Sequence, residues 1–135
     1  MYSLGLPKKI YFLGIGGVGM SGLAGWCYSN QHQVAGYDKN DNAFTLKLKK
    51  RGIFIHHDAV KSKIPKDFLN TKDTYVIYTP AIKKDHILYR FFRDSNFTIL
   101  KRSELLKRIS LEYKVIGISG THGKTTISIM LSHIL

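Results

Sequence analysis

A glycine-rich turn between an apolar strand and a helix is the feature that most constrains this chain. The segment "KIYFLG" is predicted to be a buried strand, and the spacing Gly14-x-Gly16-x-x-Gly19 follows it and opens a helix that ends near Asn30. In this context Gly14 allows a tight turn, Gly16 lets the backbone approach a pyrophosphate, and Gly19 lets helix and strand pack closely. Because a helix N-terminus offers unpaired N–H groups, the pattern predicts a diphosphate-binding turn.

Strand-like and helix-like segments alternate along the rest of the chain. Further strands are predicted at residues 33–38, 53–56, 74–79, 97–100 and 114–119. Helices are predicted at residues 42–52, 85–95, 103–113 and from 124 onward, with Ser103 as the N-cap of the third of these. This alternation favours an α/β fold: a Rossmann-like, doubly wound parallel sheet of about five strands with helices on both faces.

The composition is that of a soluble globular protein with excess positive charge. Apolar residues make up 44% of the chain, and neither a membrane-spanning run nor a signal peptide is evident, so we expect a cytoplasmic protein without a membrane partner. Cys27 is the only cysteine, which fits a reducing compartment. The formal net charge of +12 attracts anions, but the lysines are dispersed and no nucleic-acid-binding motif accompanies them. We therefore expect phosphorylated small molecules, and not nucleic acid, as partners.

Asp38 ends the second predicted strand, nineteen residues after Gly19. Nicotinamide-binding domains place there the acid that accepts hydrogen bonds from ribose hydroxyls. Taken alone, this half of the chain fits NAD as well as any other ribose diphosphate, so a free-standing NAD-binding regulatory module is one alternative. A tight strand–helix turn without a ligand, with Asp38 as a turn former, is another.

A second glycine turn stands near residue 120. The pattern Gly120-x-x-Gly123-Lys124-Thr125 follows the last predicted strand and resembles a P-loop, although Ile118 stands where the general motif has its first glycine. Lys124 can reach the β- and γ-phosphates of a nucleotide, and the Thr125 hydroxyl can reach Mg²⁺. We therefore predict a first domain over residues 1–112. Residues 113–135 would supply the first strand, P-loop and helix start of a truncated ATPase domain.

Together, "IYFLGIGGVGMSGLA" and "GISGTHGKTT" resemble the Mur ligases, and the resemblance covers the whole chain. Members of this family have an N-terminal Rossmann-like domain for a UDP-sugar, a central ATPase domain and a C-terminal domain for the amino acid. The resemblance is closest to members that add L-alanine to UDP-N-acetylmuramate in peptidoglycan precursor synthesis, using ATP and Mg²⁺ to form an acyl phosphate. The related ligase that recycles muropeptides is an alternative. We expect this chain to be an N-terminal part of such an enzyme, inactive by itself.

The resemblance also implies roles for single residues. His57 lies in "HHDA", where His56 replaces a glycine of the family; Thr79 and Ala81 lie in "YTPAI"; and Arg102 lies in "LKRSELL" as an anion contact. The implied UDP-sugar contacts are Gly14, Gly16, Gly17, Val18, Gly19, Met20, Asp38, His57, Thr79, Ala81 and Arg102. The implied ATP contacts are Gly120, Thr121, His122, Gly123, Lys124, Thr125 and Thr126, with Lys124 catalytic and Thr125 a metal ligand.

Overall fold

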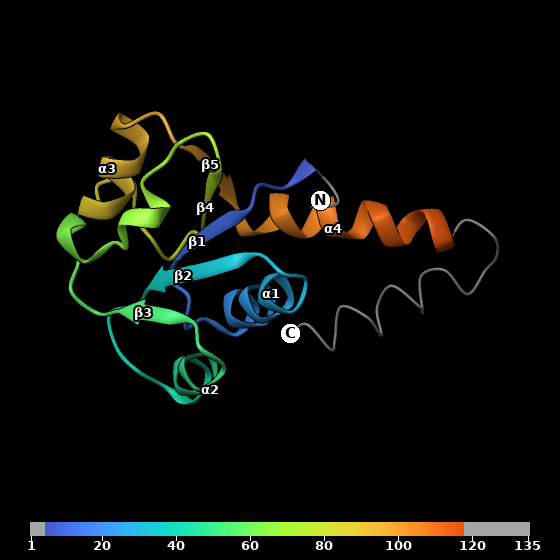
Figure 1. Ribbon diagram of the computed structural model, residues 1–135, viewed down its shortest axis with the longest axis horizontal. Helices are drawn as coiled ribbons and strands as arrows, with labels where there is room; N and C mark the ends of the chain where they lie inside the picture. Colours follow the sequence, from blue (N-terminus) through green and yellow to red (C-terminus); the bar gives the residue numbers. More distant parts are fainter. Residues whose placement is uncertain (1–4, 118–135) are drawn as a thin grey trace.

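The computed structural model describes residues 5–117, which form one parallel sheet with helices on both faces (Figure 1). The strands are β1 (Lys9–Leu13), β2 (Gln33–Tyr37), β3 (Phe54–His56), β4 (Thr74–Tyr78) and β5 (Thr98–Lys101). They lie in the order β3-β2-β1-β4-β5, and every neighbouring pair is parallel. This confirms the predicted doubly wound α/β sheet of five strands.

Two apolar layers sandwich the sheet, because successive side chains of each strand point to opposite faces. The helices are α1 (Val18–Ser29), α2 (Ala43–Arg51), α3 (Ile87–Asp94) and α4 (Arg102–Gly117), with short 3₁₀ helices at η2 (Lys61–Lys63) and η3 (Lys66–Phe68). Ile10 and Phe12 of β1 pack in the layer formed with α1, α2 and α4. Tyr11 and Leu13 of the same strand pack in the opposite layer, with α3 and η3.

The ends of α2 follow standard capping chemistry. The Asn42 side chain accepts hydrogen bonds from the N–H groups of Phe44 and Thr45, and the Thr45 hydroxyl accepts from the Asn42 N–H, which completes a capping box. Gly52 ends the helix in the left-handed region, with φ +106°. Both boundaries agree with the sequence prediction to within a residue.

The start of α4 differs from the prediction. The helix begins at Arg102, and the Lys101 N–H donates to Oε1 of Glu104 at 3.0 Å. Ser103 therefore lies within the first turn, so its prediction as the N-cap is wrong. The reason is that Glu104, three residues after Lys101, reaches back to the Lys101 N–H and caps the helix one turn before its own position.

The end of α4 also differs from the prediction. The helix continues through Gly117, so residues 114–117 are helical where a strand was expected to begin. A helix satisfies its hydrogen bonds within its own segment, whereas a strand requires a neighbouring strand, and β5 is the last strand of the described sheet. The rest of that expected strand lies outside the described residues, and the domain boundary near residue 112 stays a prediction.

A histidine is buried on the α3 side of the sheet. Nδ1–H of His56 donates to the Asp58 carbonyl oxygen at 2.9 Å, which leaves Nε2 to accept a hydrogen bond from the Tyr11 hydroxyl. Burial lowers the pKa of His56 and raises the pKa of Tyr11 well above its ordinary value, so both are neutral near pH 7. The pair satisfies the polar groups that β1 and β3 bring into this layer.

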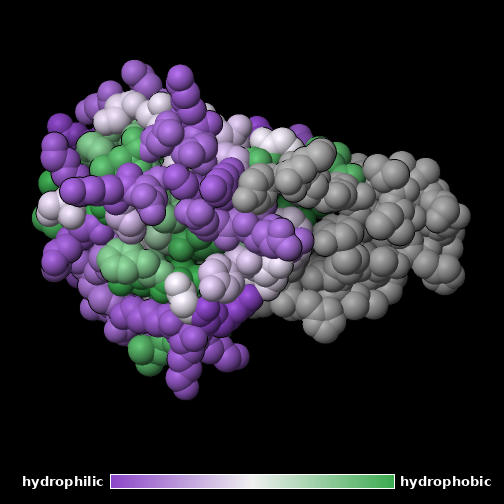
Figure 2. All heavy atoms as spheres, in the orientation of Figure 1, coloured by the Kyte–Doolittle hydropathy of each residue, from purple (hydrophilic) through white to green (hydrophobic). Residues whose placement is uncertain are grey.

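The outer surface of the described part is largely hydrophilic in the view of Figure 2, with apolar patches between the polar side chains. Within the described residues, none of the helices combines the length and the apolar character that a membrane crossing requires.

Candidate functional site

The candidate residues collect at the carboxyl edge of the sheet. Register places the last residues of the five strands in one row, and these are His56, Tyr37, Leu13, Tyr78 and Lys101. The residue that follows each strand end is a predicted UDP-sugar contact, and these are His57, Asp38, Gly14, Thr79 and Arg102. In parallel sheets of this kind, ligands bind beyond the carboxyl ends of the strands, where the chain order changes direction. Here that point lies between β1 and β4.

The glycine turn after β1 is held by the end of β2. The N–H groups of Gly14 and Ile15 both donate to the Tyr37 carbonyl oxygen, at 2.8 and 3.0 Å. Gly14 has φ +87°, a conformation that only glycine adopts without strain. The turn then enters α1 with Gly17 as its N-cap residue.

The first turn of α1 offers backbone N–H groups. The first helical hydrogen bond runs from the Ser21 N–H to the Gly17 carbonyl oxygen, at 2.8 Å. The N–H groups of Val18, Gly19 and Met20 precede it, and Gly17 supplies no side-chain cap. The Met20 side chain is buried in the core, so only its backbone can serve a ligand, whereas Val18 is exposed. This arrangement suits an anion.

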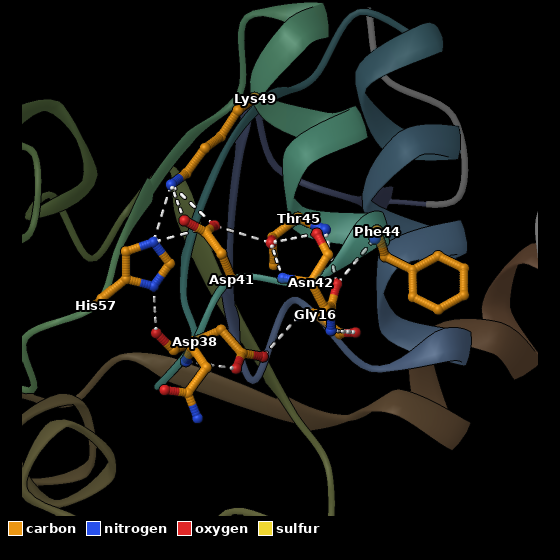
Figure 3. Close-up of polar contacts among 9 residues, drawn as sticks. Gly16, Asp38, Asp41, Asn42, Phe44, Thr45, Lys49 and His57 are labelled. Atoms are coloured by element: carbon orange, nitrogen blue, oxygen red, sulfur yellow. Dashed lines mark hydrogen bonds and ion pairs between the residues drawn. The ribbon is translucent and has the colours of Figure 1, made fainter.

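Gly16 lies against the start of α2. Its N–H donates to Oδ2 of Asp38 at 2.7 Å, and its carbonyl oxygen accepts from Nδ2 of Asn42 at 2.9 Å (Figure 3). A Cβ added to Gly16 would stand 2.8 Å from Asp38 Oδ2 and 2.8 Å from the Thr45 methyl carbon. Sequence reasoning explained Gly16 by the approach of a pyrophosphate, but the structure shows that α2 already requires a glycine here.

Arg102 brings a positive charge to the glycine turn. A Cβ added to Gly19 would stand 2.6 Å from Nη1 of Arg102, so the guanidinium packs directly on the first turn of α1. The absent side chain of Gly19 thus makes room for Arg102 of α4. Helix N-terminus and guanidinium both favour an anion, and they meet at one place.

His57, Lys49 and Asp41 form a small polar cluster beside Asp38, on the side opposite Gly16 (Figure 3). Nδ1–H of His57 donates to the Asp38 carbonyl oxygen at 2.8 Å, and Nε2 lies 2.9 Å from Nζ of Lys49. Lys49 also lies 2.9 Å from Asp41, and its hydrogen bond lowers the pKa of the Asp41 carboxyl. Lys49 and Asp41 were not predicted from the sequence.

Thr79 and Ala81 lie on the loop after β4. A Cβ added to Gly14 would lie 3.8 Å from the Thr79 hydroxyl oxygen, so this loop faces the glycine turn. The Thr79 hydroxyl also lies 3.3 Å from the Ala81 N–H, which donates to it. Ala81 itself is exposed.

Sequence reasoning missed Asn42 and Thr45. The signal that could have found them is the polar pair Asn42 and Thr45 at the start of a predicted helix, the spacing of a capping box. The expected ATP and metal residues, 120–126, lie outside the described residues. Among the residues that are described, no group of three or more His, Cys, Asp or Glu side chains could hold a metal ion.

Comparison with known proteins agrees with this geometry. The model of the Mur ligase family, catalytic domain, matches residues 9–114. The UDP-N-acetylmuramate–L-alanine ligase of Cytophaga hutchinsonii is 44% identical over 94% of this chain and 27% of its own length. The enzyme of the same name from Porphyromonas gingivalis is 40% identical over 95% of this chain and 28% of its own length. The chain thus spans little more than a quarter of these relatives.

Solved structures show the same fold. The UDP-N-acetylmuramate-alanine ligase from Thermotoga maritima superposes with a TM-score of 0.69 and 30% identity, over 78% of this chain and 23% of that protein. A UDP-N-acetylmuramate:L-alanyl-gamma-D-glutamyl-meso-diaminopimelate ligase from Neisseria meningitides superposes with a TM-score of 0.64 at 20% identity, over 74% of this chain and 30% of that protein, a likeness of fold alone. With the family match spanning most of its length, this chain belongs to the Mur ligase family.

Proposed function

We propose that this chain is the UDP-sugar-binding part of an ATP-dependent ligase that joins L-alanine to UDP-N-acetylmuramate. The observation that carries the proposal is the meeting of the α1 N-terminus with the Arg102 guanidinium, at the carboxyl edge of the sheet. The relatives from Cytophaga hutchinsonii and Porphyromonas gingivalis carry the name of such a ligase, and their similarity covers nearly all of this chain.

The diphosphate of the sugar nucleotide would lie on the first turn of α1. The N–H groups of Val18 and Gly19 would donate to its oxygens, and Arg102 would neutralise part of its charge. Thr79 and Ala81, on the loop that faces the turn, would face the sugar side of the ligand. His57, beyond Asp38, would lie toward the uridine end.

ATP, when bound in the complete enzyme, supplies the phosphoryl group that activates the lactyl carboxylate of the substrate. Residues 120–126 would hold its phosphates through backbone N–H groups and Lys124, with the Thr125 hydroxyl on Mg²⁺. A mutation in the proposed ATP site tests whether that site is separate from the proposed UDP-sugar site. In the complete enzyme, Lys124→Ala should abolish ligation and leave UDP-sugar affinity nearly unchanged. A large loss of UDP-sugar affinity in that variant would mean that the two glycine turns share one ligand.

Calorimetry on the chain itself tests the proposal. UDP-N-acetylmuramate and UDP should bind, and NAD(H) should bind much more weakly or not at all. Arg102→Ala tests the proposed site: this variant should bind UDP more weakly, while its circular dichroism spectrum stays that of the folded chain. Tight NAD(H) binding without a response to either uridine nucleotide would instead support a nicotinamide-binding module.

A further inference from the structure

We propose that Asp38 and Asn42 act together as a clamp that holds the Gly16 backbone by its N–H and its C=O and thereby positions the diphosphate-binding turn. The proposal rests on the proposed function and deepens it. Asn42 is then a positioning residue, and Asp38 affects the ligand through Gly16 and not through a contact with ribose. Sequence reasoning had given Asp38 the ribose contact and Asn42 no role.

The N–H side of the clamp is a charge-assisted hydrogen bond. The Asp38 carboxylate accepts from the Gly16 N–H through Oδ2 at 2.7 Å, the short distance typical of an ionised acceptor. Its other oxygen, Oδ1, lies 3.4 Å from the Asn40 N–H. The Asp38 backbone is fixed in turn, since its N–H donates to the His56 carbonyl oxygen and its carbonyl oxygen accepts from His57.

The C=O side of the clamp is fixed by the cap of α2. Oδ1 of Asn42 accepts from the N–H groups of Phe44 and Thr45, at 2.8 and 2.9 Å, so the orientation of the side-chain amide is determined. Its Nδ2 must then face outward from α2, where it donates to the Gly16 carbonyl oxygen at 2.9 Å. One side chain thus caps α2 and holds the glycine turn before α1 (Figure 3).

The clamp directs the ligand to one side of the turn. Because the Gly16 N–H already donates to Asp38, it is not available to a phosphate oxygen. The Asp38 carboxylate also repels a second anion brought close to Gly16. The diphosphate is therefore expected to lie on the N–H groups of Val18 and Gly19 and toward Arg102, the side away from Asp38.

Asn42→Asp is the first test, because aspartate is an equally good N-cap for α2, and it also adds a charge that repels an anion. It keeps the shape and the cap but places an acceptor oxygen where Nδ2 donated to Gly16. Calorimetric titration of the chain with UDP and with inorganic pyrophosphate should show a loss of about tenfold for both probes, the size expected for one hydrogen bond. Asn42→Ser caps α2, adds no charge and is too short to reach Gly16, so its loss of affinity, in the same direction, measures the lost hydrogen bond without charge repulsion. Unchanged affinity in both folded variants would overturn the clamp.

The two probes also separate positioning from direct contact at Asp38. If Asp38 acts through the turn, Asp38→Asn changes the affinities for UDP and pyrophosphate by the same factor. A loss for UDP alone would show that Asp38 contacts the nucleoside, which would overturn this part of the proposal.

A nuclear magnetic resonance readout distinguishes failure of the clamp from failure of the proposed function. The amide proton of Gly16 should resonate strongly downfield in the wild-type chain and move upfield in Asp38→Asn. If the wild-type chain binds neither probe, the proposed function fails, while this signal still tests the clamp. A Gly16 resonance that is identical in both proteins would overturn it.

Discussion

The guanidinium of Arg102 occupies the space that a side chain at Gly19 would fill, with Nη1 2.6 Å from the position of the absent Cβ. This contact joins the start of α4 to the start of α1. It brings a cation to the first turn of α1, where we propose that the diphosphate lies.

Arg102→Ala is expected to weaken UDP binding by about one to two decades, because a charge-assisted hydrogen bond contributes roughly 1.5–3 kcal/mol. Arg102→Lys should recover part of the affinity, since it keeps the charge but not the planar fork. Lys107→Ala, at an exposed position of the same helix, is the control with the same change in net charge. Equal losses in Lys107→Ala and Arg102→Ala would show a general charge effect and no specific contact.

Gly16 and Gly17 are adjacent, but substitution should affect them differently. A Cβ at Gly16 would stand 2.8 Å from both Asp38 and Thr45, whereas one at Gly17 would meet nothing nearer than 3.7 Å. Gly16→Ala should therefore lower the free energy of unfolding by roughly 1–3 kcal/mol, as overpacking does. Gly17→Ala should cost about 1 kcal/mol or less, the effect of a poorer N-cap. Urea unfolding of both variants measures the difference, and equal costs would contradict the packing seen around Gly16.

The stability of the fold should fall as the pH drops below about 6.5. Burial lowers the pKa of His56, His32 and His86 below the ordinary value of 6.5. Below that value the unfolded chain binds protons that the folded chain does not, so the free energy of unfolding decreases with decreasing pH. The stability that these neutral histidines contribute is fully present above the pKa of an unfolded-state histidine. It is lost as the pH falls through that pKa and below it.

Thermal unfolding at about pH 7.5 and about pH 5.5 tests this, because the carboxylates stay largely ionised over that interval. His56→Gln should reduce the pH dependence, since glutamine does not titrate. A midpoint that does not change between the two pH values would show that these histidines titrate equally in both states.

Cys27 should not react with thiol reagents while the protein is folded. Its side chain is fully buried on α1, and burial raises the pKa of the thiol to about 12, so almost no thiolate forms near pH 8. Ellman's reagent should label it completely in denaturant and only slowly under native conditions. Fast stoichiometric labelling of the native chain would contradict the packing of α1 on the sheet.

The sequence was sufficient to predict the elements that depend on local pattern. The strands around Phe12 and Val76 are apolar runs bounded by turn residues, and Asn42 and Gly52 mark the ends of α2. The row of residues beyond the strand ends was also within reach, because parallel strands align their carboxyl ends. The pairing of Asp38 with Gly16 was not predictable, since it depends on how closely the chain after β2 approaches the turn after β1. The N-cap predicted at Ser103 and the strand predicted to begin at residue 114 were wrong, because local sequence pattern does not decide between two competing hydrogen-bond arrangements.

The shared acceptor at Tyr37 has a consequence for how the site opens. Because the amides of Gly14 and Ile15 both donate to a carbonyl at the end of the neighbouring strand, their hydrogens exchange with solvent only when the turn separates from the end of β2. Opening of the turn is thereby coupled to the carboxyl end of β2, at the edge of the sheet where the site lies. A ligand that binds there, and not to the unfolded chain, raises the free energy of unfolding by RT ln(1 + [L]/Kd).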